Sequence, residues 1–108
     1  MLHSVDVSRA GIGDVVALIG AGPIGLLLLQ LIKLVGASQI LVVDMKDERL
    51  RLAAMLGADV VVNPSKEDPM GSLKELTRGK GADVVIEAVG SSITVKQATQ
   101  MVRKGVEL

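Results

Sequence analysis

Residues 15–35 read VVALIGAGPIGLLLLQLIKLV, and this stretch decides the fold. It opens with a short apolar run, 15–19, whose β-branched residues are typical of a buried strand. Gly20, Gly22 and Gly25 follow in the spacing G-x-G-x-x-G. An apolar segment then runs without breakers to Gly36, which predicts a buried helix over 23–35 with a proline in its first turn.

The rest of the chain repeats this alternation. Further strands are predicted in three apolar runs, 40–43, 60–62 and 84–86, and further helices at 47–56, 69–78 and 92–103. The sequence GADVVV at 57–62 returns as GADVVI at 81–86, so each copy is expected to be a turn that leads into a buried strand. The polar loop 63–69 is expected at the surface. The order predicts an α/β fold, a Rossmann-type doubly wound parallel sheet of about four strands in the order 3-2-1-4 with flanking helices.

The composition argues against nucleic acids and membranes as binding partners. The 108 residues carry 12 basic and 12 acidic side chains and no Phe, Tyr or Trp. A neutral chain without aromatic rings favours neither nucleic acid nor a membrane surface. The longest apolar run is interrupted by Gln30 and Lys33 and is shorter than the roughly 20 residues that cross a bilayer. No basic-then-apolar signal peptide opens the chain, so we expect a cytoplasmic location.

The glycine cluster has the context of a dinucleotide site. It follows a predicted strand and opens a predicted helix. Gly20 can form the tight turn, Gly22 lets a pyrophosphate approach the backbone, and Gly25 allows the helix to pack closely against the strand. The helix N-terminus then offers free N–H groups to phosphate. The alternative is that these glycines only shape a turn.

An acid completes the pattern. Asp44 ends the second predicted strand, 19 residues after Gly25. A carboxylate there accepts hydrogen bonds from the ribose diol and repels a 2′-phosphate, so Asp44 favours NAD over NADP. Lys46, Arg49 and Arg51 lie nearby and could serve a phosphate instead. In the alternative, Asp44 is a surface acid.

Three segments together resemble a known family. GDVVALIGAGPIGLLLLQLIKLVGASQILVVD, LGADVVVNPSKED and GKGADVVIEAVGS are similar to the cofactor-binding domain of zinc-containing medium-chain alcohol and polyol dehydrogenases, such as sorbitol, butanediol and threonine dehydrogenases. The resemblance runs from about residue 7 to residue 105. It implies an oxidoreductase that binds NAD and moves a hydride between an alcohol and the cofactor.

The resemblance also implies roles for individual residues. It assigns the cofactor-binding set to the glycine loop, the end of the second strand and the loop after the fourth strand: Gly20, Gly22, Pro23, Ile24, Gly25, Asp44, Met45, Arg49, Val89 and Gly90. It supplies no catalytic residue and no metal ligand in this chain, because the zinc ligands and proton relay of the family lie in a catalytic domain that these residues do not match. The chain has no cysteine and one histidine, His3.

We therefore expect residues 1–108 to be a partial NAD-binding Rossmann domain, incomplete at its C-terminus and inactive alone. A strand over 84–86 would then form an apolar sheet edge, which predicts self-association. Two alternatives stay open, a nucleotide-binding regulatory module and a remnant that binds nothing. Glu87 is interpreted as a structural acid bonded to the backbone or to water, and His3 as a surface residue.

Overall fold

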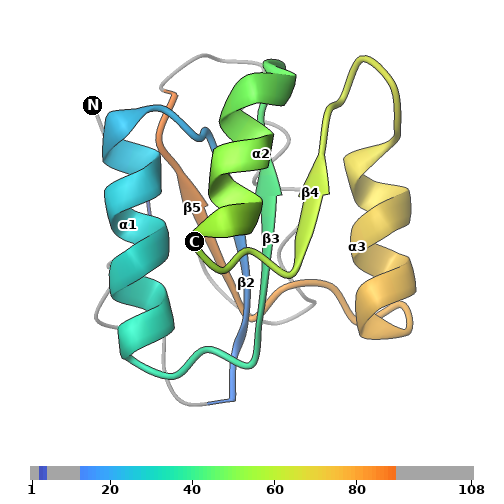
Figure 1. The fold of residues 1–108 in the computed structure, drawn as a ribbon. Helices are drawn as coiled ribbons and strands as arrows, with labels where there is room; N and C mark the ends of the chain where they lie inside the picture. The colour runs from blue at the N-terminus through green and yellow to red at the C-terminus, as the bar shows by residue number, and fades with distance from the viewer. Residues whose placement is uncertain (1–2, 5–12, 90–108) are drawn as a thin grey trace.

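The computed structural model describes residues 3–4 and 13–89 (Figure 1). The elements run in the order β1 (His3–Ser4), β2 (Val15–Ile19), α1 (Pro23–Leu34), β3 (Gln39–Val43), α2 (Asp47–Met55), β4 (Val60–Val62), α3 (Pro69–Thr77) and β5 (Val84–Glu87). All but β1 were predicted, and each predicted boundary agrees with the structure to within one residue. The helix predicted at 92–103 lies outside the described residues.

The sheet has the predicted topology with one added strand. Its order is β1-β5-β2-β3-β4, and β2, β3, β4 and β5 run parallel. The four parallel strands therefore have the expected order 3-2-1-4. Ile19 at the carboxyl end of β2 pairs in register with Val43 of β3 on one side and Glu87 of β5 on the other. The loops that follow these three strands therefore meet at the carboxyl ends of the strands.

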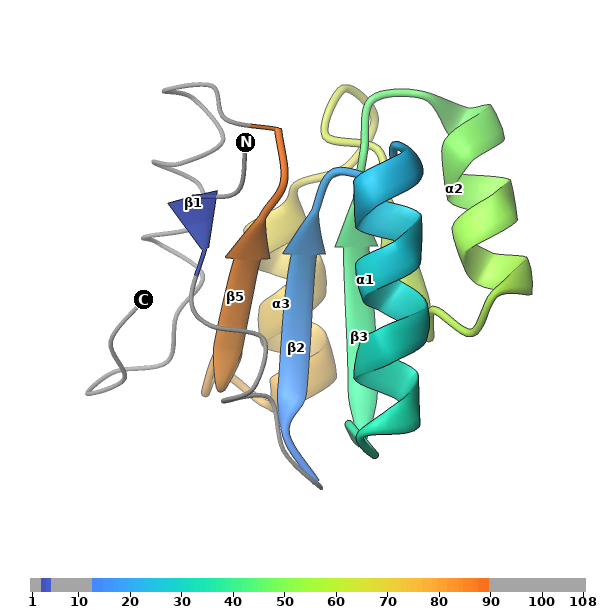
Figure 2. The same ribbon diagram turned by 90° about the vertical axis from the view of Figure 1, so that its left-hand side faces the viewer.

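The prediction that the fourth parallel strand forms a bare edge is wrong for its carboxyl half. The two-residue strand β1 pairs antiparallel with β5, His3 with Glu87 and Ser4 with Ile86. Figure 2 shows β1 beside β5 at the outer side of the sheet. An apolar strand with open hydrogen-bonding groups is a favourable partner for any nearby backbone, and a short terminal segment fills that role here.

The sheet buries both of its faces. Side chains alternate along each strand, and one face, with Leu18 and Val42, packs against α1 and α2 through residues such as Leu29 and Leu50. The other face, with Ile19 and Leu41, packs against Leu73 of α3. Figures 1 and 2 show α1 and α2 on one side of the sheet and α3 on the other. The continuous apolar runs of the sequence follow from this two-sided burial.

Helix α1 was predicted as a buried helix, and the structure buries one face of it. Leu28, Leu29 and Ile32 face the sheet. The outward face carries Leu27 and Leu34, and Leu34 is 82% exposed. Apolar residues all around the helix suggested burial, but only one side of it meets the sheet. No helix in the described part of the chain is long and apolar enough to cross a membrane.

The GAD repeat of the sequence is a repeat of structure. Asp59 precedes β4, and its carboxylate accepts a hydrogen bond from the Ile40 N–H at 2.8 Å while its own N–H donates to the Ile40 carbonyl. Asp83 precedes β5 and makes the same pair of bonds with Val15. Each aspartate therefore anchors the amino end of the neighbouring strand.

Candidate functional site

The glycine loop begins at the carboxyl end of β2, where the three central strands end side by side. Gly20 has φ +110°, a conformation that other residues rarely adopt. A Cβ on Gly20 would lie 2.9 Å from Cγ2 of Val89. The chain therefore turns at Gly20 while packed against the loop that follows β5, which only glycine allows.

Gly22 and Gly25 have opposite surroundings. A Cβ on Gly25 would lie 2.0 Å from the carbonyl oxygen of Gly20, so α1 can approach the turn only because residue 25 has no side chain. Among the described residues, a Cβ on Gly22 would come within 4 Å of Nη1 of Arg49 alone, at 3.9 Å. Gly20 and Gly25 thus have the turn and packing roles that the sequence predicts, and the part of the chain that the structure describes leaves the space in front of Gly22 open.

The open glycine lies at the start of a helix. Gly22 is the N-cap of α1, Pro23 follows in the first turn, and no side chain among the described residues caps this end. The first-turn N–H groups of a helix have no partner within the helix, and the dipole makes that end electropositive. Ile24 is half exposed beside them. This arrangement suits a phosphate group.

Asp44 ties the end of β3 to the glycine loop. Its Oδ2 accepts a hydrogen bond from the Ala21 N–H at 2.8 Å, and its Oδ1 accepts one from the Lys46 N–H at 2.9 Å. Nη1 of Arg49 lies 3.8 Å from Oδ2, and the Asp44 side chain is only 8% exposed. Asp44 is therefore an ordered acid within the loop cluster rather than a free surface acid.

The predicted residues fall in one region. The structure brings Gly20 against Val89, Asp44 against the glycine loop, and the Arg49 guanidinium close to both Asp44 and Gly22. Met45 follows Asp44 and is 70% exposed, and Val89 is half exposed. Gly90 lies outside the described residues.

Glu87 has the structural role that was expected. It is fully buried at the end of β5, and its Oε1 accepts a hydrogen bond from the Val89 N–H at 2.5 Å. This bond holds the loop after β5, and Val89 in turn touches the Gly20 turn. Glu87 thus acts on the backbone of the candidate site.

Sequence reasoning missed Asn63, which was assigned to a surface loop. Asn63 follows β4 and is only 8% exposed. Its side-chain amide donates to the Met45 carbonyl and to Oδ1 of Asp47, both at 3.0 Å, and its Oδ1 accepts from the N–H and the hydroxyl of Ser65. The N-P-S sequence after an apolar run is a signal for such a local turn, but it does not reveal the two distant partners.

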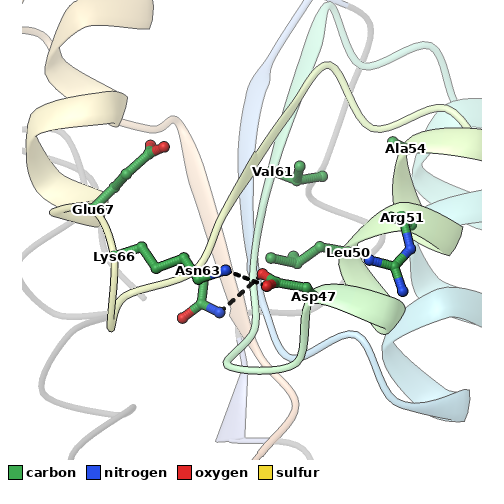
Figure 3. A pocket seen from close by; sticks show the side chains of 8 residues that line it. All are labelled: Asp47, Leu50, Arg51, Ala54, Val61, Asn63, Lys66 and Glu67. Atoms are coloured by element: carbon green, nitrogen blue, oxygen red, sulfur yellow. Dashed lines mark hydrogen bonds and ion pairs between the residues drawn. The ribbon is translucent and has the colours of Figure 1, made fainter.

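A cavity of about 350 Å³ lies between α2 and the loop after β4 (Figure 3). Eight residues line it: Asp47, Leu50, Arg51, Ala54, Val61, Asn63, Lys66 and Glu67. None of them belongs to the predicted cofactor-binding set. The Lys66 ammonium, which donates to Asp47, and then the Asn63 amide hold the pKa of the Asp47 carboxyl below its ordinary value of 3.8.

The described residues offer no donor set for zinc. Among residues 3–4 and 13–89, no three His, Cys, Asp or Glu side chains gather closely enough to hold a metal ion. The whole sequence has one histidine and no cysteine, and histidine nitrogen and cysteine sulfur are the ligands most typical of protein zinc sites.

Comparisons with known proteins agree with this fold. Residues 23–108 match the family described as zinc-binding dehydrogenase. L-threonine 3-dehydrogenase of Bacillus subtilis is 42% identical over 104 residues, which cover 96% of this chain and 30% of that enzyme. Alcohol dehydrogenase TADH from Thermus sp. ATN1 is 43% identical with a TM-score of 0.87, covering 91% of this chain and 28% of that one.

A third similar protein was solved with a bound cofactor. It comes from Sinorhizobium meliloti 1021, is described as a zinc-binding dehydrogenase and holds NADP. It is 35% identical with a TM-score of 0.80, and the match covers 90% of this chain and 29% of that one. The chain spans about 30% of the length of the curated relatives it matches.

Proposed function

The chain belongs to the zinc-binding dehydrogenase family, and from this premise we propose that residues 1–108 are part of the NAD-binding Rossmann domain of an alcohol or polyol dehydrogenase. The observation that carries the proposal is the hydrogen bond from the Ala21 N–H to the Asp44 carboxylate. It holds the Asp44 carboxylate, a group that can accept hydrogen bonds from ribose hydroxyls, directly beside the glycine loop, and this supports a dinucleotide site.

The glycine loop would bind the pyrophosphate. No described residue fills the space in front of the Gly22 Cα, and the N-terminus of α1 supplies N–H donors without a described side-chain cap. Ile24 and Val89, both half exposed, would offer apolar contact to the rings of the cofactor. When bound, a nicotinamide dinucleotide accepts or donates a hydride, and the protein supplies binding and orientation.

Asp44 would bind the adenosine ribose. An ionised carboxylate has about four acceptor sites, and two backbone N–H groups occupy two of them here. The remaining sites can accept the ribose hydroxyls without reorientation of the side chain, because the backbone already fixes it. Met45, exposed next to Asp44, would lie against the adenine.

We propose NAD rather than NADP as the cofactor. The negative charge of Asp44 would repel a 2′-phosphate, and Arg49 lies 3.8 Å from that carboxylate, where it is engaged by the acid. The Sinorhizobium meliloti relative was solved with NADP, so a similar protein accommodates the phosphorylated cofactor. The preference of this chain is therefore the property that an experiment must measure.

In the whole dehydrogenase, the proposed reaction is hydride transfer between an alcohol and the nicotinamide ring. Zinc does not fit the donor set of this chain. The steps that depend on zinc and on the alcohol pocket would belong to other parts of such an enzyme. The contribution of these residues is to hold the cofactor in one orientation.

The test is a calorimetric titration of the 108-residue chain with NADH, NADPH and AMP, with Asp44→Ala alongside. Far-UV circular dichroism first establishes that both proteins are folded. Binding of NADH and AMP, weak binding of NADPH, and a shift toward NADPH in the variant would support the proposal. A folded chain that binds none of the three ligands would contradict it for these residues and favour a non-binding remnant.

A further inference from the structure

Asn63 forms a buried amide clamp beneath the Asp44–Asp47 turn. Its side chain can make two donor and two acceptor hydrogen bonds, and all four are made in the structure, to Met45, Asp47 and twice to Ser65. Figure 3 shows Asn63 pointing toward Asp47 across the gap between β4 and α2. A fully bonded buried amide has one favourable orientation, so it can hold its partners in place.

The two groups that Asn63 holds lie on either side of the turn. The Met45 carbonyl comes directly after Asp44, and Asp47 opens α2. The Asp44 N–H also donates to the Val62 carbonyl at 3.1 Å, next to Asn63 in sequence. The end of β4 therefore fixes the turn from one side, while the Asp44 carboxylate fixes it to the glycine loop from the other.

Lys66 completes the clamp. It pairs with Oδ2 of Asp47, while Asn63 donates to Oδ1 of the same carboxylate. The negative charge of Asp47 is thus balanced by a cation, and Asn63 needs to contribute only a neutral donor. An acidic residue at position 63 would instead face both the Met45 carbonyl and the Asp47 carboxylate with acceptors alone.

We infer that Asn63 is a positioning residue that orients the Asp44–Met45 segment for the adenosine half of a dinucleotide. The inference rests on the proposed function, because it needs Asp44 to contact the ribose. Asn63 touches no ligand itself. It acts through the Met45 backbone. Without it, the Ala21 and Lys46 N–H groups still bind the Asp44 carboxylate, but the Asp44–Met45 segment loses a support from the end of β4 and is oriented less precisely toward the ribose hydroxyls.

The experiment compares AMP with 2′-deoxy-AMP by calorimetry on the full chain. A ribose hydroxyl bonded to a carboxylate makes the wild type prefer AMP by roughly tenfold or more. We expect Asn63→Ala and Asn63→Asp to reduce this preference to about threefold or less. The ratio of the two affinities does not depend on the fraction of folded chain, so a general loss of stability would leave it unchanged.

Ser65→Ala is the matched control. It removes the Ser65 hydroxyl that donates to Asn63, but keeps both bonds by which Asn63 holds the turn. It should keep the wild-type preference. Sucrose in the buffer favours the compact state, so weakly stable Asn63 variants can be measured in their folded form.

The outcomes separate the two ideas. If the wild type prefers AMP and the Asn63 variants keep that preference, Asn63 is only structural and the inference is wrong, while the proposed function stands. If the folded wild type binds neither nucleotide, or binds both equally, the ribose role of Asp44 fails and the inference fails with it. Loss of the preference in both Asn63 variants, but not in Ser65→Ala, establishes the positioning role.

Discussion

The carboxylate of Asp44 accepts a hydrogen bond at 2.8 Å from the backbone N–H of Ala21, a residue 23 positions earlier in the chain. Ala21 is fully buried, so its N–H has little access to water as a substitute partner. The acid proposed to bind the ribose therefore also helps to build the glycine loop.

Replacement of Asp44 should for this reason affect stability as well as binding. Asp44→Ala removes the acceptor for two backbone N–H groups, which should lower the free energy of unfolding by about 1–3 kcal/mol. Urea unfolding followed by far-UV circular dichroism measures this, since the chain has no aromatic residue to report by fluorescence. An unchanged unfolding midpoint would show that the loop does not depend on Asp44.

Two glycine variants should separate folding from binding. In Gly25→Ala the new methyl group would lie 2.0 Å from the Gly20 carbonyl oxygen, so we expect a loss of stability of about 1–3 kcal/mol or more. In Gly22→Ala the methyl group would approach only Arg49 among the described residues, and φ is −71°, which alanine adopts freely. This variant should unfold like the wild type but bind NADH at least about tenfold more weakly, because the methyl group blocks the pyrophosphate. Equal stability of the two variants would contradict the packing role of Gly25.

The Asp47–Lys66 pair should give the chain a specific acid sensitivity. Lys66 and Asn63 lower the pKa of Asp47 in the folded state. A lowered carboxyl pKa stabilises the folded chain above the unfolded-state pKa, and this stabilisation is lost as the pH falls through the folded-state value. The wild type should therefore exceed Asp47→Asn in stability at about pH 6, and the difference should shrink below about pH 4.

Because both side chains of this pair are partly exposed, salt should also reduce the difference. Urea midpoints at several pH values, at low salt and at about 0.5 M salt, measure both effects. A difference that stays constant between neutral and acidic pH would show that the pair does not act through the charge of Asp47.

Self-association of the isolated chain remains a prediction, and the structure suggests a second surface for it. Strand β1 pairs with only two residues of β5, and the outward face of α1 exposes leucines. In the double variant Leu27→Lys/Leu34→Lys, stability should change by less than about 0.5 kcal/mol per substitution, because these side chains face solvent. Sedimentation equilibrium should show a lower average mass than for the wild type. An unchanged mass distribution would point back to the strand edge.

Much of the fold could be predicted because its signals are local. The glycine spacing, the β-branched runs and the GAD repeat each indicate a structure within a few residues, and Gly20 and Gly25 have the surroundings that the pattern implies. Other features depend on partners far apart in the chain. Nothing near Asn63 indicates Met45 and Asp47 as its partners, and nothing in residues 3–4 specifies pairing with β5. Which side of α1 meets the sheet is likewise decided only when the helix packs.

The two aspartates that precede β4 and β5 hold neighbouring strands at their amino ends, which leaves the loops at the carboxyl ends free to differ in sequence. Asp59 and Asp83 each fasten the start of a neighbouring strand by side chain and backbone together. If a strand shifted its pairing register by one residue, its apolar side chains would point to the wrong face of the sheet. The hydrogen bonds of Asp59 and Asp83 oppose such a shift at the amino ends of the strands. The loops at the carboxyl edge therefore do not have to set the alignment of the strands. The sequences of these loops can change to bind a different nucleotide or a different partner, while the strands keep their order and register.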